Sequence, residues 1–475
     1  MKQTIFLTSV FVFFLSFTAN AQNKDGGISK QMLKEIQQAQ SYSMADRALF
    51  NAMASNKIDD LAQNFSKRSE RDTYFSVETP KQSITNQRSS GRCWMFSGFN
   101  VLRANFAAQC ANDPEMKDFG GLELSQNYLF FWDQLEKANL FLQGVIDCAD
   151  KPIDDTRVRF FFKSPLNDGG TFCGVSDLVE KYGVVPAEVM PETFSAENTS
   201  KSSQLIKSKL REQGLKLRQM VNGGKSKAVV NKEKQEMLTV IYHMLSLVYG
   251  APVKEFSYSF KDKNGKAIGE AQTYTPLSFA KKIGAEKING TFLMVMNDPR
   301  RPYHKTYEVE YDRHVYDGHN WVYLNLPMDE IEALAIASLK DGRKLYSSYD
   351  VNKQSDRKVG YNDLNNFDYE SLFGTPFTMN KAERISTYDS GSTHAMTLCA
   401  VDLTADGKAK KWKVENSWGY DAGQKGYLIM TDEWFREYMF RLVVNKKYVS
   451  ETLLKEAAQK PVMVMPEDPL FLPDE

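Results

Sequence analysis

One cysteine stands where a catalytic thiol would be expected. Cys93 follows a Gly-Arg pair in "QRSSGRCWMFSGFN", at the point where an apolar pattern with helical spacing begins. A thiol attacks carbonyl carbon as the thiolate, which a helix N-terminus and a neighbouring imidazole both favour. Cys93 is therefore our candidate nucleophile.

Three residues could assist it. His394 in "GSTHAMTLCAVD" begins an apolar strand, and Asn416 in "KVENSWGYDAG" follows a strand that we expect to pair with the His394 strand, so Asn416 could orient the imidazole. Gln87 lies six residues before Cys93 and could donate, with the Cys93 backbone N–H, to the oxyanion of a tetrahedral intermediate. Each residue alone is more often structural, but the combination favours a cysteine nucleophile with a histidine base.

The elements that must position these residues change along the chain. The pattern predicts a buried helix from Cys93 and a second helix at 122–142, and then helices in a Lys-rich stretch between residues 196 and 250. In the last 200 residues, short β-branched or alternating runs are separated by Asn, Asp and Gly turns. They predict an antiparallel sheet: "TFLMVMNDP", "HAMTLCAVDLT", "KKWKVENSWG", "KGYLIMT" and "FRLVVNKKYV".

The N-terminus has the composition of an export signal. Lys2 precedes an apolar run at 5–17, and small residues at Ala19 and Ala21 suit cleavage before Gln22. A membrane anchor is the alternative, but the run is shorter than the roughly 20 residues that a spanning helix needs. We expect a cleaved signal peptide at 1–21, a secreted or periplasmic protein and no membrane anchor.

The five cysteines fit no metal or redox motif. Their number is odd and no two have a C-x-x-C spacing. We expect Cys110, Cys148, Cys173 and Cys399 to be small buried apolar residues, although export leaves one disulfide possible. The clustered histidines at 304, 314 and 319 have no ligand spacing, so we expect them at the surface, and no metal or cofactor is expected.

The net charge of the chain does not indicate any class of binding partner. Acidic and basic residues number 60 each, so the formal net charge is zero. The segment 201–236 has ten basic and three acidic residues, but its charges are mostly lysines and no aromatic residue is interleaved with them. A solvated helical face or an oligomer contact is therefore favoured over nucleic-acid binding.

Several segments together resemble one family of peptidases. "TNQRSSGRCWMFS", "LSQNYLFFWD", "NKAERIST", "THAMTLCAVD" and "VENSWGYDAGQKGYLIMTDEWF" are similar to the bleomycin hydrolase and aminopeptidase C branch of the papain-like cysteine peptidases. The similarity extends from about residue 70 to the C-terminus. It implies an α+β fold, with a helical lobe and an antiparallel β lobe in the two-lobed papain-like arrangement, and large helical insertions. About 300 positions separate the Cys and His, against roughly 130–150 in simple papain-like enzymes.

The resemblance also implies roles for individual residues. Cys93 would be the nucleophile, His394 the general base and acid, Asn416 the orienting amide and Gln87 the oxyanion donor. The loop Asp168, Gly169 and Gly170 would receive an extended peptide, and Trp418 would shield the His394–Asn416 hydrogen bond from water. No cofactor is implied, and the partners would be peptide substrates and other copies in a homohexameric ring.

The end of the chain departs from the family pattern. In that branch a C-terminal arm lies in the cleft and its carboxylate limits the substrate to a free amino end; here the chain ends "MPEDPLFLPDE", which makes Glu475 the corresponding residue. The favoured function is a cysteine aminopeptidase. An endopeptidase or dipeptide-releasing enzyme is the alternative if the arm leaves the cleft open, and a ring that binds peptides or nucleic acid is the non-enzymatic alternative.

These observations divide the chain into six segments. They are a signal peptide (1–21), an N-terminal helical arm (22–80), a helical lobe with the nucleophile (81–195), a basic helical insertion (196–275), a β lobe with the His and Asn (276–465) and a C-terminal arm (466–475).

Overall fold

Cys93 begins the central helix of a helical lobe. The computed structural model of the chain describes residues 26–471, so the expected signal peptide and Glu475 lie outside the described residues. Helix α4 (Cys93–Cys110) is buried over most of its length and packs against α7 (Phe172–Tyr182), which also contacts α5 (Gln126–Asp147). The second helix begins four residues later than expected because Ser125 caps it by accepting from the Tyr128 backbone N–H.

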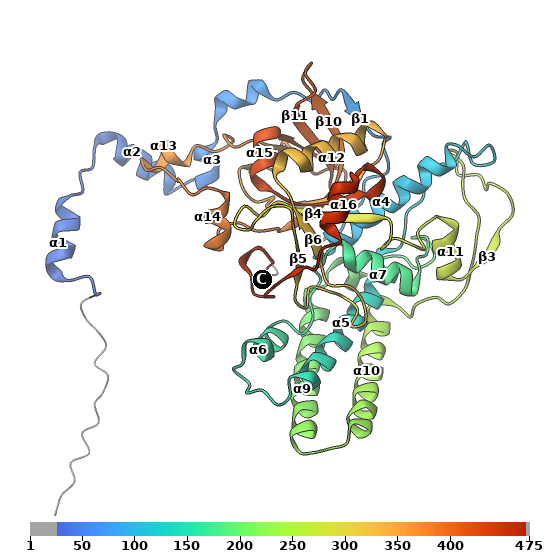
Figure 1. Cartoon of the computed structure of the whole chain (residues 1–475). Helices are drawn as coiled ribbons and strands as arrows, with labels where there is room; N and C mark the ends of the chain where they lie inside the picture. Colours follow the sequence, from blue (N-terminus) through green and yellow to red (C-terminus); the bar gives the residue numbers. More distant parts are fainter. Residues whose placement is uncertain (1–25, 472–475) are drawn as a thin grey trace, which may run out of the picture. The chain divides into compact units, whose positions relative to one another are not determined.

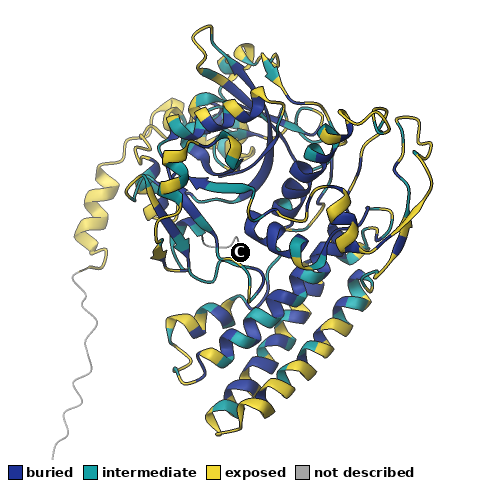
Figure 2. Ribbon diagram, turned by 45° about the vertical axis from the view of Figure 1, so that its right-hand side comes forward, coloured by how far each residue is buried: buried dark blue, intermediate teal, exposed yellow. Residues whose placement is uncertain are grey.

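Two long helices form a hairpin on α5. The basic segment folds into α9 (Ser200–Asn222) and α10 (Lys227–Tyr249), which contact each other and α5. Figure 2 shows buried residues along the faces of these helices that meet and exposed residues on the outer faces. The lysines therefore occupy a solvated face, as the alternation of apolar and charged residues requires.

Shorter helices complete the helical part. They are α6 (Thr156–Lys163), α8 (Phe194–Glu197) and α11 (Pro276–Lys282), beside a small two-stranded sheet of β2 (Phe256–Tyr258) and β3 (Gln272–Tyr274).

The β lobe is built on one large sheet with the order β14-β5-β6-β4-β13-β7-β10-β11-β12-β9-β8, and β1 pairs with β10. Its strands are β1 (Val77–Glu78), β4 (Phe292–Met296), β5 (Lys305–Val309), β6 (Val322–Asn325), β7 (Leu345–Tyr349), β8 (Ser355–Asp356), β9 (Tyr361–Asn362), β10 (His394–Leu403), β11 (Ala409–Glu415), β12 (Tyr427–Thr431), β13 (Met439–Asn445) and β14 (Val462–Val464). The five expected strands are all present. The sheet is mixed rather than antiparallel, since β4–β6, β5–β14 and β9–β12 pair in parallel after long connections.

Apolar cores lie on both faces of the sheet. One core joins the sheet to the helical lobe and contains Trp94, and the other contains Trp412 and Trp434. Helix α12 (Met328–Lys340) and helix α15 (Asp432–Tyr438) cover this second core (Figure 1). The remaining helices are α13 (Tyr369–Phe373), α14 (Lys381–Ser386) and α16 (Glu451–Ala457), with 3-10 turns at Phe65–Glu70, Lys446–Tyr448 and Pro469–Phe471.

The N-terminal segment differs in extent from the expected arm at 22–80. The chain divides into two compact units at Ala62, and the first contains α1 (Lys30–Gln38), α2 (Met44–Met53) and α3 (Ile58–Ala62). Residues 63–80 belong to the second unit, where β1 pairs with β10 because its backbone groups complete a ladder there.

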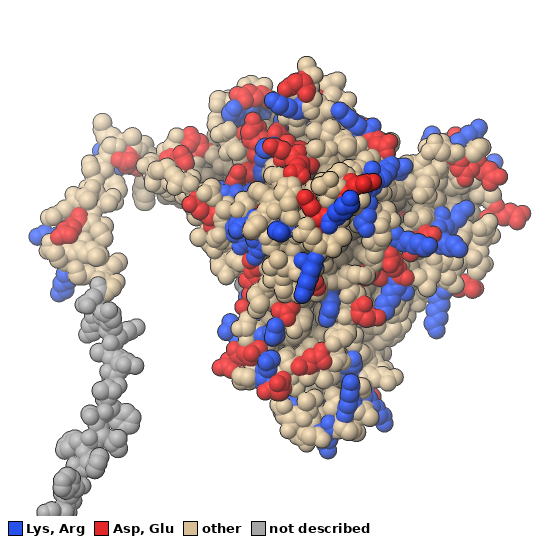
Figure 3. Space-filling view, viewed as in Figure 1, with Lys and Arg blue, Asp and Glu red and all other residues tan. Residues whose placement is uncertain are grey.

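The molecular surface carries both signs of charge. On the face shown in Figure 3, acidic and basic side chains are interspersed over the main body. Within residues 26–471, no helix is both long and apolar enough to cross a membrane.

Candidate active site

Cys93 lies at the first turn of α4. The flanking Arg92 does not cap the helix with its side chain; it is buried, pairs with Glu192 at 2.8 Å and lies over the Phe130 ring. The partial positive charge of this helix end therefore acts on the half-buried thiol and favours its thiolate.

His394 and Asn416 are hydrogen-bonded to each other. Strands β10 and β11 are paired neighbours, and the His394 Nε2 atom lies 2.8 Å from the Asn416 Oδ1 atom. Because an amide oxygen accepts, Nε2 donates and Nδ1 stays available toward the cavity. The Ser417 backbone N–H donates to the same oxygen at 2.8 Å, which fixes the orientation of the amide. The Trp418 ring packs on the imidazole with centroids 4.9 Å apart.

Burial keeps the His394 imidazole neutral when no thiolate faces it. It lowers the pKa of His394 to about 4, and the hydrogen bond to Asn416 partly opposes this shift. The nearby Arg357 charge lowers the pKa further. A charged imidazolium in this position consequently depends on a thiolate partner.

Gln87 is held so that one of its amide hydrogens is unused. Its Oε1 accepts from Ser417 Oγ at 2.6 Å, and its Nε2 donates to the Ser90 carbonyl at 2.6 Å. Its backbone N–H donates to the Ser417 carbonyl at 2.7 Å. An amide nitrogen has two hydrogens, so one remains for an oxyanion.

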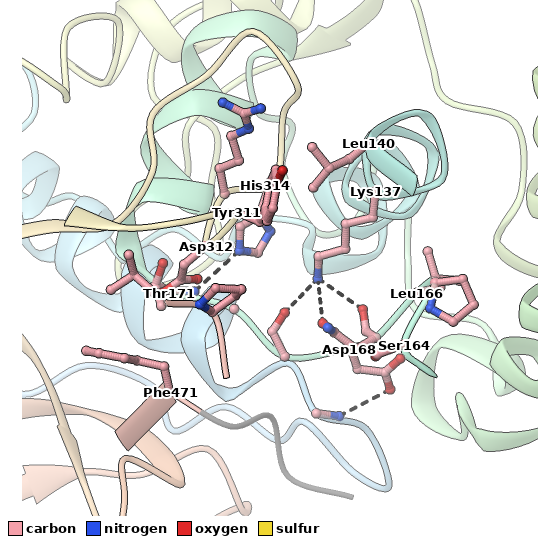
Figure 4. Close-up of a pocket in the computed structure, with 18 of the residues that line it drawn as sticks. Lys137, Leu140, Ser164, Leu166, Asp168, Thr171, Tyr311, Asp312, His314 and Phe471 are labelled. Atoms are coloured by element: carbon pink, nitrogen blue, oxygen red, sulfur yellow. Dashed lines mark hydrogen bonds between the residues drawn. The ribbon is translucent and has the colours of Figure 1, made fainter. Parts of the chain in front are cut away.

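The loop with Asp168, Gly169 and Gly170 is held by hydrogen bonds from Lys137, which extends toward it from the neighbouring helix (Figure 4). Lys137 Nζ donates to the carbonyls of Asn167 at 3.0 Å and Gly169 at 2.6 Å. The Asp168 carboxylate accepts from the Gly91 backbone N–H at 3.3 Å, beside the nucleophile's helix. The Asp168 side chain thus joins the loop to the segment before Cys93.

His314 corrects an expectation from the sequence. We expected it at the surface, but only 2% of it is exposed; His304 and His319 do have exposed side chains. The His314 ring lies beneath Gly170, where an added Cβ would be 2.2 Å from its Cε1 atom. Its Nδ1 is hydrogen-bonded to the Asp133 carboxylate. Burial by itself would raise the pKa of Asp133, but Lys137 and His314 outweigh this effect and hold that pKa below its usual value.

One cavity of about 880 Å³ brings the candidate residues together. Cys93, His394 and Gln87 line it with the loop 168–170, whereas Asn416 and Trp418 contact His394. The C-terminal arm reaches this cavity as far as Phe471, and Asp468 anchors it through Arg300 at 2.7 Å and Arg301 at 2.6 Å. Among residues 26–471, no group of three or more His, Cys, Asp or Glu could hold a metal ion.

The other cysteines are buried and unreactive. Within the described chain Cys110, Cys148, Cys173 and Cys399 form no disulfide, and burial raises the pKa of Cys110 to about 11 and that of Cys399 to about 12. Cys93, half-buried in the cavity wall, is the thiol that can reach a bound carbonyl.

A family model decides the relationship: the Peptidase C1-like family matches residues 27–471. The chain belongs to this family. It is 39% identical over 426 residues to aminopeptidase C of Lactobacillus delbrueckii subsp. lactis, covering 88% of this chain and 92% of that protein. It is 38% identical over 412 residues to human bleomycin hydrolase, covering 83% of this chain and 88% of that protein.

A solved structure agrees with the sequence comparison. The crystal structure of PepW from Lactobacillus rhamnosis HN001 superposes with a TM-score of 0.87 at 37% identity, over 94% of this chain and 99% of that chain. The protein has the papain-like peptidase fold and is a cysteine peptidase, which confirms the resemblance and the fold class.

Residues that orient the site were missed in the sequence. Asp133, Lys137 and His314 hold the loop, and Ser417 holds Gln87. Ser417 could have been inferred from its place in "VENSWG", but Asp133 and Lys137 read only as polar positions on a helix.

Proposed function

We propose that this protein is a cysteine aminopeptidase that removes N-terminal residues from peptides. The observation that carries the proposal is that Cys93, His394 and Gln87 line a single cavity, which Pro466 and Phe471 of the C-terminal arm also line. The names of the aminopeptidase relatives support the same activity.

The residues would act in two steps. The Cys93 thiolate attacks the carbonyl carbon of the substrate's first residue, and the oxyanion accepts from the free Gln87 N–H and the Cys93 backbone N–H. His394 gives its proton to the leaving amine as the C–N bond breaks. His394 then takes a proton from water, which attacks the acyl-enzyme and releases the free amino acid and the thiolate.

Three further residues would position other groups and take no part in bond making: Asn416, Trp418 and Asp168. The Asn416 Oδ1 atom accepts the hydrogen bond from His394 Nε2, and the Trp418 ring excludes water from that hydrogen bond. The glycine backbone of the loop would pair with an extended peptide. On the resemblance to the family, the carboxylate of Glu475, which lies outside the described residues, would pair with the substrate's ammonium group.

Paired fluorogenic substrates test the activity and its register. The protein from residue 22 onward is incubated with substrates that differ only in a free or acetylated amino end, beside Cys93→Ser. We expect cleavage of the free-amine substrate alone, loss in the variant, inactivation by iodoacetamide and no effect of chelators. Turnover that survives Cys93→Ser refutes the thiol mechanism, and equal cleavage of both substrates refutes the aminopeptidase register.

We further propose a homohexameric ring, on the resemblance to the family. Helix α1 supports a contact between copies, since Met32, Leu33 and Ile36 are about half exposed and the helix buries no residue. Light scattering of the purified protein should give about six times the protomer mass, and a monomer would exclude the ring.

We propose export to the periplasm or beyond the cell, which rests on the composition of residues 1–21. N-terminal sequencing of the protein from fractionated cells should begin at Gln22. An intact Met1 in the cytoplasmic fraction would contradict export.

A further inference from the structure

A row of three residues crosses the sheet from the catalytic histidine. Ala395, next to His394, pairs with Ser348 of β7, and Ser348 pairs with Arg441 of β13. All three line the active-site cavity, as does Tyr346, two residues before Ser348 on β7. Adjacent strands are about 4.8 Å apart, so a long Arg441 side chain can approach a group bound beside Ala395.

Arg441 is a buried cation with no carboxylate beside it in the described chain. Only 7% of the residue is exposed, and its Nε is buried without a hydrogen-bond partner. Its guanidinium lies over the rings of Trp321 at 5.1 Å and Phe471 at 5.5 Å, contacts that hold its position without neutralising its charge. Buried charges are ordinarily paired, so this one is suited to a ligand.

A second polar group in this wall is also unsatisfied. Tyr346 is 1% exposed and its hydroxyl is buried without a hydrogen-bond partner among residues 26–471. With Arg313 Nε, three buried polar atoms of this wall lack a hydrogen-bond partner in the described structure, an exception to the rule that buried polar atoms are hydrogen-bonded. A carboxylate could accept from both Arg441 and Tyr346, since it has two oxygens.

The charges of the cavity wall favour an anion. Three of its cations, Lys207, Arg313 and Arg441, have neither an ion pair nor a side-chain hydrogen bond in the described structure, against one such anion, Asp312. The other ionisable side chains of the wall are held by partners: Lys137 and Arg211 donate to backbone carbonyls, Asp168 accepts from hydroxyls, and Glu310 pairs with Arg157 at 3.2 Å.

We propose that Arg441 and Tyr346 form a subsite that selects peptides with a Glu or Asp side chain in one of the first two residues. The inference rests on the proposed peptidase function and adds the class of substrate. The guanidinium and the hydroxyl donate to the substrate carboxylate, and Ala395 and Ser348 leave room for the side chain because both are small.

Matched substrates with Glu or the isosteric Gln test this subsite. We measure kcat/KM for aminoacyl and dipeptidyl fluorogenic amides, with Glu or Gln at the first or second residue, using the full-length mature protein. We expect kcat/KM to be at least about tenfold higher with Glu than with Gln at one position, which corresponds to about 1.4 kcal/mol. In Arg441→Met this ratio should fall close to one, and Tyr346→Phe should lower it by about threefold.

A second cation of the wall gives the matched control. Arg313→Met removes the same charge, and should lower the ratio by no more than about twofold if recognition is local. An equal fall in both variants would overturn a specific Arg441 contact. Arg441→Lys keeps the charge and should keep part of the preference, which covers the case in which Arg441→Met does not fold.

The wild-type protein alone can overturn the inference. If it cleaves the Gln substrates but shows no preference for Glu at either position, the subsite does not select acids and the inference is overturned. If it cleaves none of the free-amine substrates, the proposed function fails instead.

Discussion

Replacement of Gln87 by Ala should slow catalysis while leaving the thiol reactive. In the structure, Ser417 and Ser90 use the amide oxygen and one amide hydrogen of Gln87, so one N–H is available to the oxyanion. Loss of one such donor costs about 2.7–4 kcal/mol of transition-state stabilisation, which is a decrease in kcat of about 10²–10³-fold. KM should change by less than about threefold, because the oxyanion exists only in the transition state.

Alkylation of Cys93 separates this role from a structural one. The reaction of iodoacetamide with a thiolate forms no oxyanion, so its rate constant in Gln87→Ala should stay within about threefold of wild type. Ser417→Ala is the matched control: it removes the bond that orients the amide but keeps the donor, and should lower kcat by about tenfold. Unchanged kcat in Gln87→Ala would refute the assignment, and a parallel loss of alkylation would mean that Gln87 positions Cys93 instead.

Four further outcomes follow from contacts in the site. Lys137→Met removes one of the two partners of the buried Asp133 carboxylate, which keeps only His314, and frees the substrate loop, so urea unfolding should show a loss of about 3–5 kcal/mol. Gly170→Ala places a methyl group into the imidazole beneath it and should raise KM at least about tenfold, whereas Gly290→Ala has open space and should not. In Cys93→Ser no thiolate faces the imidazole, so the pKa of His394 is lowered to about 4 from an ordinary 6.5 and, as pH falls, the unfolded chain binds this proton first; the unfolding free energy of this variant should therefore fall between about pH 6.5 and 4, and by less when His394→Asn is added. Asp468→Asn weakens the two arginine pairs of the C-terminal arm and should raise cleavage of acetylated relative to free-amine substrates several-fold.

The local chemistry of the site could be predicted because each residue lies at the end of a regular element. The apolar spacing after Cys93 predicted α4, and the alternating runs around His394 and Asn416 predicted two strands that pair, as they do. The start of α5 was misplaced by a few residues, because its boundary depends on the Ser125 cap rather than on periodicity. The parallel pairs of the sheet could not be predicted, since they join strands whose partners are set by the whole packing.

His314 illustrates what residue pattern alone cannot supply. Its neighbours in sequence are charged and aromatic, which is typical of a surface loop, yet it is buried between Gly170 and Gly174 from another part of the chain. The glycines admit the ring because they lack a Cβ, and Asp133 accepts from its Nδ1, so burial leaves that polar nitrogen satisfied. The acid, the imidazole and Lys137 thus form one buried unit under the substrate loop, and only the fold brings its members together. The precision of the loop, and with it the position of a bound peptide relative to Cys93, depends on this unit as much as on the residues that react.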